Sequence, residues 1–381
     1  MLNFLSGISI DLYAPSMPSM TKVFHTSTSL MQNTLSATLL GSAIGAVLFG
    51  TLIDSLGRKY VITLSLFAFS LLSLGACFAN SIFVLMLIRL GQGMLVSASS
   101  IGSRAFVLDH FTGKTLTVAL LYTSVAYALG PIVGPFFGGI LQHYFNWQAN
   151  FIAYAVYSGL LCVLVSVFYR ESIPMKHPLS LRQTTQSYAM ILKNGAFMAG
   201  MLILSCVLIE QVIYPTLGPF IIQSVLHYSA VTYGKLALIV GGGYLVGTIT
   251  NRLLVHYITP KQAVISGMSI LFFALLLHVI LIISNAMQLL TFILPLTVIE
   301  FGVGFIFANI IGICLQLFPK NVGHASAVQA LMLTLLAALG TFLISHAVTS
   351  QSWPLFGGYV VLVSLQVIGF IVLVMKMTIS P

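Results

Sequence analysis

Four ionisable side chains lie inside long apolar stretches of this sequence, where a charge is costly to hold. Asp11, Glu210 and Glu300 are three of the six acidic residues in the chain, and the fourth group is Arg89. Ionisable residues in such surroundings persist when they pair, meet water or carry protons. Desolvation favours the neutral form of a carboxyl group, whereas a nearby guanidinium favours its charged form. A carboxylate held between these two influences can gain a proton on one side of a barrier and lose it on the other.

The composition around these residues requires a helical membrane protein. Of the 381 residues, 59% are hydrophobic and only 6% are charged, whereas about 25% of the residues of a soluble domain are charged. Apolar runs of about twenty residues recur along the chain, the length that crosses a bilayer as a helix. Strands of a membrane barrel would alternate in polarity, and these runs do not alternate. Each run is therefore predicted to be a membrane-spanning helix.

Charged residues, Gly, Pro and Asn divide the chain into twelve such runs. They cover residues 2–20, 29–53, 60–79, 82–107, 115–141, 148–169, 196–223, 231–255, 262–284, 288–317, 323–349 and 355–375. The long polar segment 170–195 separates the first six runs from the last six. Two six-span halves are typical of duplicated transporters. We therefore predict an all-α integral membrane fold of two pseudo-symmetric six-helix bundles, 1–169 and 196–381, joined by a cytoplasmic linker.

The basic residues predict the orientation of the chain. If the N-terminus is cytoplasmic, eleven of the fifteen Lys and Arg residues fall on the cytoplasmic side, and only Lys22 and Lys235 fall on the opposite side. The excess of positive charge in cytoplasmic loops predicts that both termini are cytoplasmic. The net charge of +9 comes from single residues at the ends of runs. No nucleic-acid partner is expected from such a pattern.

The sequence contains no pattern that is typical of an enzyme or a metal site. The four cysteines lie in separate apolar runs, and the nine histidines form no H-x-x-x-H or H-E-x-x-H pattern. No nucleophile–base pair or nucleotide-binding loop is visible. We therefore expect no catalysis, no metal and no cofactor, with a proton gradient as the energy source. The first run is expected to act as the targeting signal in place of a cleaved peptide.

Asp11 and Arg89 are predicted to act together in proton coupling. Asp11 belongs to ISIDLYAPSMP, residues 8–18, and Arg89 lies roughly eight residues into the fourth run. With a rise of 1.5 Å per residue, both lie roughly 10–14 Å from the outer ends of their helices. Our hypothesis is that Asp11 carries the proton, that Arg89 tunes its proton affinity, and that protonation competes with substrate binding. A structural helix-end cap beside Pro15 is the alternative role of Asp11.

Glu210 and Glu300 fall near the expected midplane of the bilayer, where transporter sites usually lie. Glu210 stands in IEQVIYPTLGPF, residues 209–220, where an acid beside an aromatic ring suits a cationic amphiphile. Glu210 could equally be a second proton site, and Glu300 could be a site residue or a structural one. The predicted substrate-binding residues are Asp11, Tyr13, Tyr122, Tyr127, Glu210, Gln211, Tyr214, Glu300 and Asn309.

The loop after the second run reads GTLIDSLGRKY, residues 50–60. Gly50 can let two helices approach closely, and Gly57 can turn the chain. Asp54 can accept hydrogen bonds from a helix N-terminus. Arg58 is expected to pair with an acid on a neighbouring helix, and Asp109 at the end of the fourth run is the candidate.

The fifth run contains YALGPIVGPFFGGIL, residues 127–141. Small residues four positions apart give a flat helix face for close packing, and proline bends the helix. The residues concerned are Gly130, Pro131, Gly134, Pro135, Gly138 and Gly139. A lone G-x-x-x-G would be weak evidence, because any tightly packed pair of membrane helices can use one.

Several of these segments resemble signatures of the major facilitator superfamily. GTLIDSLGRKY matches its G-x-x-x-D-x-x-G-R-K loop, RLGQG at 89–93 resembles the R-x-x-x-G element of proton-coupled members, and the fifth run is similar to the G-x-x-x-G-P-x-x-G-G element of antiporters. IDLYAPSMP resembles the D-x-Y-x-P-x-x-P element of drug exporters of the bicyclomycin-resistance (Bcr/CflA) type. GPF at 218–220, NR at 251–252, FPKNVGHASA at 318–327 and WP at 353–354 extend the resemblance through the second half.

The resemblance implies a proton-coupled antiporter that exports small amphipathic compounds or drugs across the bacterial inner membrane by alternating access. It implies a monomer whose partners are a small-molecule substrate, protons and the lipid bilayer. It also implies that the loop at 50–60 acts as a cytoplasmic latch. The predicted gating residues are Gly50, Asp54, Gly57, Arg58, Asp109, Gly130, Pro131, Gly134, Pro135 and Gly138. Two departures stand out: only ten residues precede Asp11, so the first span is expected to be short at its cytoplasmic end, and Asn251 replaces the acid of the corresponding second-half loop.

Other functions would use some of the same residues. A dedicated exporter of one metabolite or siderophore, or a proton symporter working in uptake, could use the same carboxylates, and the six acids do not distinguish these transporters. A sensor or receptor would usually carry a large soluble output domain, which this sequence does not show.

Overall fold

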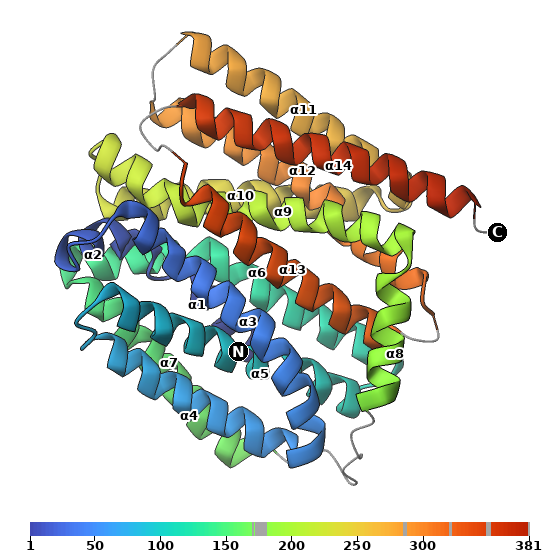
Figure 1. The fold of residues 1–381 in the computed structure, drawn as a ribbon, viewed down its shortest axis with the longest axis horizontal. Helices are drawn as coiled ribbons and strands as arrows, with labels where there is room; N and C mark the ends of the chain where they lie inside the picture. The colour runs from blue at the N-terminus through green and yellow to red at the C-terminus, as the bar shows by residue number, and fades with distance from the viewer. Residues whose placement is uncertain (170, 172–180, 285–287, 320–321, 348–351, 380–381) are drawn as a thin grey trace. The chain divides into compact units, whose positions relative to one another are not determined.

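The described part of the chain is built from helices. A computed structural model describes residues 1–169, 171, 181–284, 288–319, 322–347 and 352–379 (Figure 1). The chain divides into two compact units. The N-terminal unit holds Met1–Ser180 with Ser229–Lys235, and the C-terminal unit holds Leu181–Tyr228 with Leu236–Pro381. The division falls inside the segment 170–195 that was predicted as a linker, and the predicted bundle limits themselves stay a prediction.

The N-terminal unit contains seven α-helices and one 3₁₀ turn in its described residues 1–169. They are α1 (Leu2–Asp11), the 3₁₀ turn (Ala14–Ser16), α2 (Met17–Val23), α3 (Thr28–Leu56), α4 (Arg58–Ala76), α5 (Ile82–His110), α6 (Gly113–Tyr144) and α7 (Trp147–Phe168). Several long helices start at a polar cap: Ser27, Ser81 and Asn146 each accept a hydrogen bond from the backbone N–H three residues later. Helix α3 packs along α5, α4 along α7, and α1 along α6.

The first predicted span, 2–20, is not one continuous helix. Helix α1 stops at Asp11, and the chain passes through the 3₁₀ turn before α2 begins at Met17. Pro15 has no N–H with which to continue the helical hydrogen bonds, and Pro18 repeats the defect in the next turn. The break therefore lies directly after the buried carboxyl group.

The glycines of α6 bring this broken span close. A Cβ at Gly130 would clash with the backbone of Gly7, and a Cβ at Gly138 would clash with the carbonyl oxygen of Leu12. At Gly134 the nearest atom would be the Leu12 nitrogen at 3.5 Å, which is ordinary contact. The small-residue face predicted for the fifth run thus packs against α1, with its tightest points on either side of Gly134.

The C-terminal unit contains the remaining described helices. They are α8 (Leu181–Leu192), α9 (Gly195–Pro219), a π-helical segment (Phe220–Val225), α10 (Ala230–Leu254), α11 (Pro260–Ser284), α12 (Leu289–Gln316), α13 (Val322–Ile344) and α14 (Ser352–Ile379). The first residues of α10 group with the N-terminal unit. Helix α9 packs against α12, α13 and α14, and α11 packs against α12 and α14. Pro215 and Pro219 lie inside α9, and its last turns widen into the π-helix.

Eleven helices in the described ranges are long and apolar enough to cross a membrane. The pieces of the broken first span, α1 and α2, are each too short to be counted among these helices of the described ranges, so the twelfth predicted span stays a prediction. The segment 170–195 also differs from a plain polar connection, because it includes α8.

Candidate functional site

Arg89 is the centre of a buried polar cluster in the N-terminal unit. Its side chain is 0% exposed on α5. One terminal nitrogen donates to the Gln92 side-chain oxygen at 2.8 Å, and the other donates to the Ser9 carbonyl at 2.8 Å. Gln92 in turn donates to the Ser73 hydroxyl at 2.8 Å. The guanidinium also lies 4.1 Å from the centre of the Tyr13 ring, a cation–π distance.

The Ser9 carbonyl is available because α1 ends there. Leu12 donates to the Ile8 carbonyl as the last bond of the helix, and Tyr13 begins the irregular turn. The Tyr154 hydroxyl from α7 donates to both the Ile8 and the Ser9 carbonyls, at 3.0 and 3.1 Å. Side chains from α5 and α7 thus take the place of the helical N–H groups at the break.

Asp11 lies at the same break with its carboxylate unpaired. It is 5% exposed, and it makes no hydrogen bond or ion pair to a described residue. The predicted association with Arg89 is therefore indirect: Arg89 binds the backbone two residues before Asp11. A Cβ at Gly134 of α6 would lie 3.7 Å from the Asp11 Cβ, so the acid also faces the glycine face of α6.

Three tyrosines of the N-terminal unit that were predicted to bind substrate occupy different environments. Tyr13 is 0% exposed and shares a hydrogen bond of 2.6 Å with the Thr34 hydroxyl of α3, so its ring supports Arg89. Tyr122 and Tyr127 on α6 are 74% and 44% exposed. Substrate contact by these residues stays a prediction.

The C-terminal unit buries its own acids. Glu210 on α9 is 1% exposed, and neither carboxylate oxygen has a hydrogen-bond partner. Gln366 of α14 lies next to Glu210 without the geometry of a hydrogen bond, and both atoms of its amide are unpartnered. Glu300 on α12 is 5% exposed and has Gln211 beside it.

The other predicted substrate-binding residues of the C-terminal unit are Tyr214 and Asn309. Tyr214 is buried and stacks on Phe292 at 6.3 Å between ring centres. The Asn309 amide donates to the Asn251 side-chain oxygen at 3.2 Å and to the Phe305 carbonyl at 2.8 Å. Asn309 therefore links α12 to α10 through Asn251, the residue that replaces the acid in the second-half counterpart of the loop at 50–60.

A second cluster forms where α3 meets α4. Arg58 forms an ion pair with Asp109 of α5, the acid proposed for it from the sequence, and donates to the Ala105 carbonyl at 2.9 Å. The close helix approach expected at Gly50 is absent, because a Cβ there would meet no atom within 4 Å. Asp54 lies on α3, and its side chain is outside the described structure.

Glu171 completes this cluster at the N-terminus of α4. Its two carboxylate oxygens accept from the backbone N–H groups of Arg58 and Lys59, at 3.1 and 3.0 Å. A carboxylate is favourable there because the first N–H groups of a helix have no internal partner. Gly57 has φ 103°, and a Cβ at this position would lie 2.9 Å from the Glu171 carboxylate. Gly57 is thus needed both for the turn and for the cap.

The fold and these clusters agree with one family of known proteins. The family model described as Major Facilitator Superfamily matches residues 1–341. The chain belongs to the major facilitator superfamily. It is 26% identical over 340 residues to the chloramphenicol resistance protein CraA of Acinetobacter baumannii, a match that covers 88% of this chain and 81% of CraA.

Two further matches extend the comparison. A bicyclomycin resistance protein homolog of Haemophilus influenzae is 28% identical over 181 residues, covering 48% of this chain and 46% of that protein. The resemblance to the bicyclomycin-resistance type of exporter is confirmed by these relatives. The crystal structure of a D-xylose-proton symporter superposes with a TM-score of 0.75 at 14% identity, covering 98% of this chain and 94% of the symporter. That likeness shows the shared superfamily fold.

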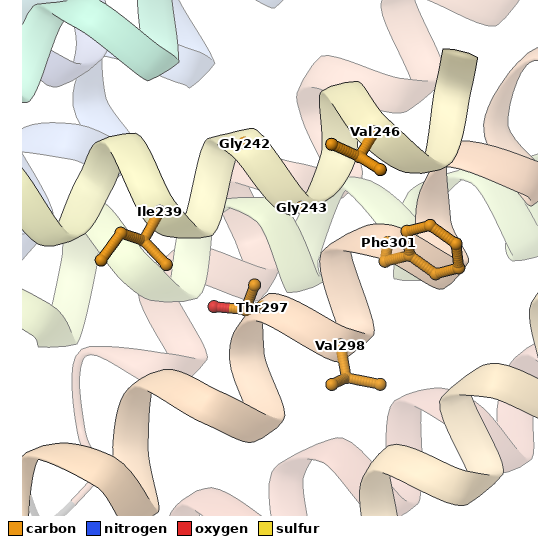
Figure 2. Close-up of a pocket in the computed structure, with 7 residues that line it drawn as sticks. All are labelled: Ile239, Gly242, Gly243, Val246, Thr297, Val298 and Phe301. Atoms are coloured by element: carbon orange, nitrogen blue, oxygen red, sulfur yellow. The ribbon is translucent and has the colours of Figure 1, made fainter. Parts of the chain in front are cut away.

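This superfamily chain also carries an apolar groove in its C-terminal unit. The groove, of about 430 Å³, opens between α10 and α12 (Figure 2). It is lined by Ile239, Gly242, Gly243, Val246, Thr297, Val298 and Phe301. The Thr297 hydroxyl donates to the Ile293 carbonyl at 2.8 Å, so the lining leaves no free polar side chain. Ile239 and Val246 are each more than half exposed, so the groove is shallow and open.

Sequence reasoning missed several members of the clusters. No sequence motif marks the residues that were missed, which are Tyr154, Thr34 and Gln366. Each lies in an apolar run, and the residue that it approaches lies elsewhere in the chain. Among the described residues, no group of three or more His, Cys, Asp or Glu could hold a metal ion.

Proposed function

We propose that the protein is a proton-coupled antiporter that exports small amphipathic compounds or drugs. The observation that carries this proposal is the unpaired carboxylate of Asp11, 5% exposed at the broken turn of the first span. Arg89 lies close by, with its terminal nitrogens already engaged by Gln92 and the Ser9 carbonyl. Asp11 is therefore free to accept either a proton or a cationic group.

Charge makes these two ligands of Asp11 compete. When Asp11 is ionised, Arg89 balances its charge within the N-terminal unit, and a cationic substrate can approach. When Asp11 is protonated, Arg89 leaves the unit with a net positive charge that repels such a substrate. Because Asp11 faces the glycines of α6, a change in its charge or ligand acts directly on the contact between α1 and α6. Proton binding and movement of these helices are thereby coupled.

The cluster around Arg58 is proposed as the cytoplasmic gate. The Arg58–Asp109 ion pair and the Glu171 cap fix the start of α4 to the ends of α5 and α7. A rigid corner of this kind can hold one conformation until substrate or proton binding shifts the equilibrium. Gly57, Gly130, Pro131, Gly134, Pro135 and Gly138 are proposed to shape the moving helices.

The amphipathic character of the substrate is supported by the C-terminal unit. The groove between α10 and α12 offers apolar surface (Figure 2). Gln211 and Tyr214 offer polar and aromatic groups, and we propose that the substrate contacts them. Tyr122 and Tyr127 are proposed as the aromatic contacts of the N-terminal unit.

The proposal includes a membrane arrangement. We propose that α1, the 3₁₀ turn and α2 together form a twelfth span, with both termini cytoplasmic and the protein in the bacterial inner membrane as a monomer. The broken first span is compatible with this because its freed Ser9 carbonyl accepts hydrogen bonds from Arg89 and Tyr154.

Transport by purified protein in lipid vesicles tests the function. An imposed pH gradient and a panel of labelled cationic and neutral drugs would be used, and we expect substrate to move opposite to the protons. Movement of substrate together with the protons would contradict export and favour uptake.

Asp11→Asn is the variant that tests the proton carrier. We expect this variant to lose pH-driven exchange while it keeps part of its drug binding, because the amide cannot release a proton. Asp11→Glu, which keeps a carboxyl group, is the control and should retain exchange. Full proton-driven transport by Asp11→Asn would overturn the role of Asp11.

A further inference from the structure

The two units differ in the balance of their buried charges. In the N-terminal unit, buried Asp11 is accompanied by buried Arg89. In the C-terminal unit, Glu210 and Glu300 are 1% and 5% exposed, and neither forms an ion pair with a described basic residue. Among the described residues, the second unit therefore buries two acids and no Lys or Arg.

We infer that Glu210 and Glu300 form a second proton-binding site, carried by the C-terminal unit itself. This goes beyond the function proposed above, in which Asp11 alone carries the proton. Removing a carboxylate from water costs several kcal/mol unless it is paired and hydrogen-bonded. Glu210 has no hydrogen bond to either oxygen, and Glu300 lies within electrostatic range of it. Two negative charges there would also repel each other, so the pair holds at least one proton.

The polar groups around Glu210 suit a neutral carboxylic acid. Gln366 is 0% exposed, and both its amide nitrogen and its amide oxygen lack partners. A protonated carboxyl group can donate to the amide oxygen and accept from the amide nitrogen, whereas a carboxylate can only accept. The Tyr359 hydroxyl, also 0% exposed and unpartnered, lies close to both acids.

Among the described residues around the pair, the other titratable groups include a tyrosine, a cysteine and a histidine. Helix α12 contributes Glu300 itself, α14 contributes Tyr359, and α9 carries Cys206 one turn before Glu210. His278 of α11 packs edge-on against Tyr359, with 6.3 Å between ring centres. Helix α13 faces this part of α9 with Gly340 against Ile209. Both acids are buried, and Glu300 has the half-buried Gln211 side chain beside it.

The spacing of acid and proline in α9 resembles that of the first span. Pro15 follows Asp11 by four positions, and Pro215 follows Glu210 by five. Each proline removes the N–H that would bond the carbonyl four residues earlier, at Asp11 and at Gln211. Helix α1 ends at Asp11, whereas α9 stays helical through Pro219. Each half of the chain thus places a buried acid about one turn before a proline, and only the first span is interrupted there.

Infrared difference spectroscopy of the purified full-length protein in detergent tests this site. Spectra in acidic and alkaline buffer would be compared for the carbonyl stretch of protonated carboxyl groups. Glu210→Gln and Glu300→Gln should each remove part of this signal, and Asp11→Asn should remove a different part. Two variants are used because either could fail to fold. A signal unchanged in both glutamine variants would overturn the second site.

Stability and ligand binding separate a proton site from a substrate site. Because glutamine imitates a protonated glutamate, Glu210→Gln should melt no lower than the wild type in alkaline buffer. Its affinity for tetraphenylphosphonium, a cationic probe, should stay within about twofold of the wild type. A tenfold loss of that affinity would show that ionised Glu210 binds the cation, and would overturn the proposal. The infrared signal is read without transport, so failure of export would leave this test intact.

Discussion

At the scale of single residues, the arrangement around Arg89 is governed by how a buried guanidinium is satisfied. Arg89 has no ion-pair partner among the described residues, yet both its terminal nitrogens donate hydrogen bonds and its flat face lies on Tyr13. This arrangement leaves Asp11 without a fixed partner. A direct Asp11–Arg89 bond would have to be broken whenever Asp11 gained a proton, whereas the observed geometry keeps Arg89 in place in both charge states.

Tyr154→Phe tests whether the end of α1 needs the hydrogen bonds that the Tyr154 hydroxyl donates to its carbonyls. The variant removes a buried donor to the Ile8 and Ser9 carbonyls, which should cost about 1 kcal/mol of stability and slow pH-driven exchange. The measurements are the apparent melting temperature in detergent and the rate of exchange in vesicles. Tyr157→Phe is the matched control, because Tyr157 lies on the same helix and donates to the Met1 carbonyl at an exposed position. Equal effects of the two variants would contradict the importance of the break.

At the scale of helices, the contact between α1 and α6 is the element that links chemistry to movement. The glycines of α6 let the α1 backbone approach where the helix has just been interrupted. Close packing of two backbones transmits small displacements, since there are few flexible side chains between them to absorb a shift.

Gly138→Ala tests this contact, with Gly134→Ala as its partner variant. A methyl group at Gly138 would clash with the Leu12 carbonyl, so α1 would have to move, whereas at Gly134 it would meet its nearest atom at 3.5 Å. We expect Gly138→Ala to lose most transport, at least tenfold in initial rate, and Gly134→Ala to keep it within about twofold. Membrane insertion of both variants would be checked by their yield in the membrane fraction. Normal transport by Gly138→Ala would show that the contact is not tight in the working protein.

At the scale of the whole molecule, the charge pattern predicts the orientation of the chain. Arg58, Asp109 and Glu171 are gathered in one cluster at the start of α4, and the charge pattern predicts that this cluster lies on the cytoplasmic side. Helices α3 to α7, together with the interrupted first span that contains α1 and α2, are consistent with six crossings of that half.

A reporter that fluoresces only when it folds in the cytoplasm tests this topology. Fused after residue 381 it should fluoresce, and fused after residue 80, between α4 and α5, it should stay dark. Because the fusion after residue 80 shortens the protein, a second short fusion is the control. This one is placed after residue 57, between α3 and α4, and it should fluoresce. Fluorescence from the residue 80 fusion together with a dark C-terminal fusion would reverse the assigned orientation.

The membrane helices, the superfamily and the location of the buried charges could be predicted from the sequence alone. The length and frequency of the apolar runs predict membrane helices, because a backbone in lipid must satisfy its hydrogen bonds within each segment. The loop at 50–60 and the glycines of the fifth run predict the superfamily, and the few ionisable residues inside apolar runs single out Asp11, Arg89, Glu210 and Glu300. The helical membrane fold and the superfamily are confirmed, because those inferences depend on local composition and spacing, whereas the roles of the four ionisable residues stay predictions.

Only the tertiary structure decided which groups meet. The Tyr154 hydroxyl donates to the Ser9 carbonyl, although the two residues are 145 positions apart in the chain. No periodicity in the sequence predicts such a pair. The interruption of α1 leaves the Ser9 carbonyl free, and Arg89 binds that carbonyl in preference to the carboxylate of Asp11. Likewise, Gln366 stands beside Glu210 because α14 packs on α9. Charge location follows from the sequence, whereas the partner of each charge follows from where the helices break and how they pack.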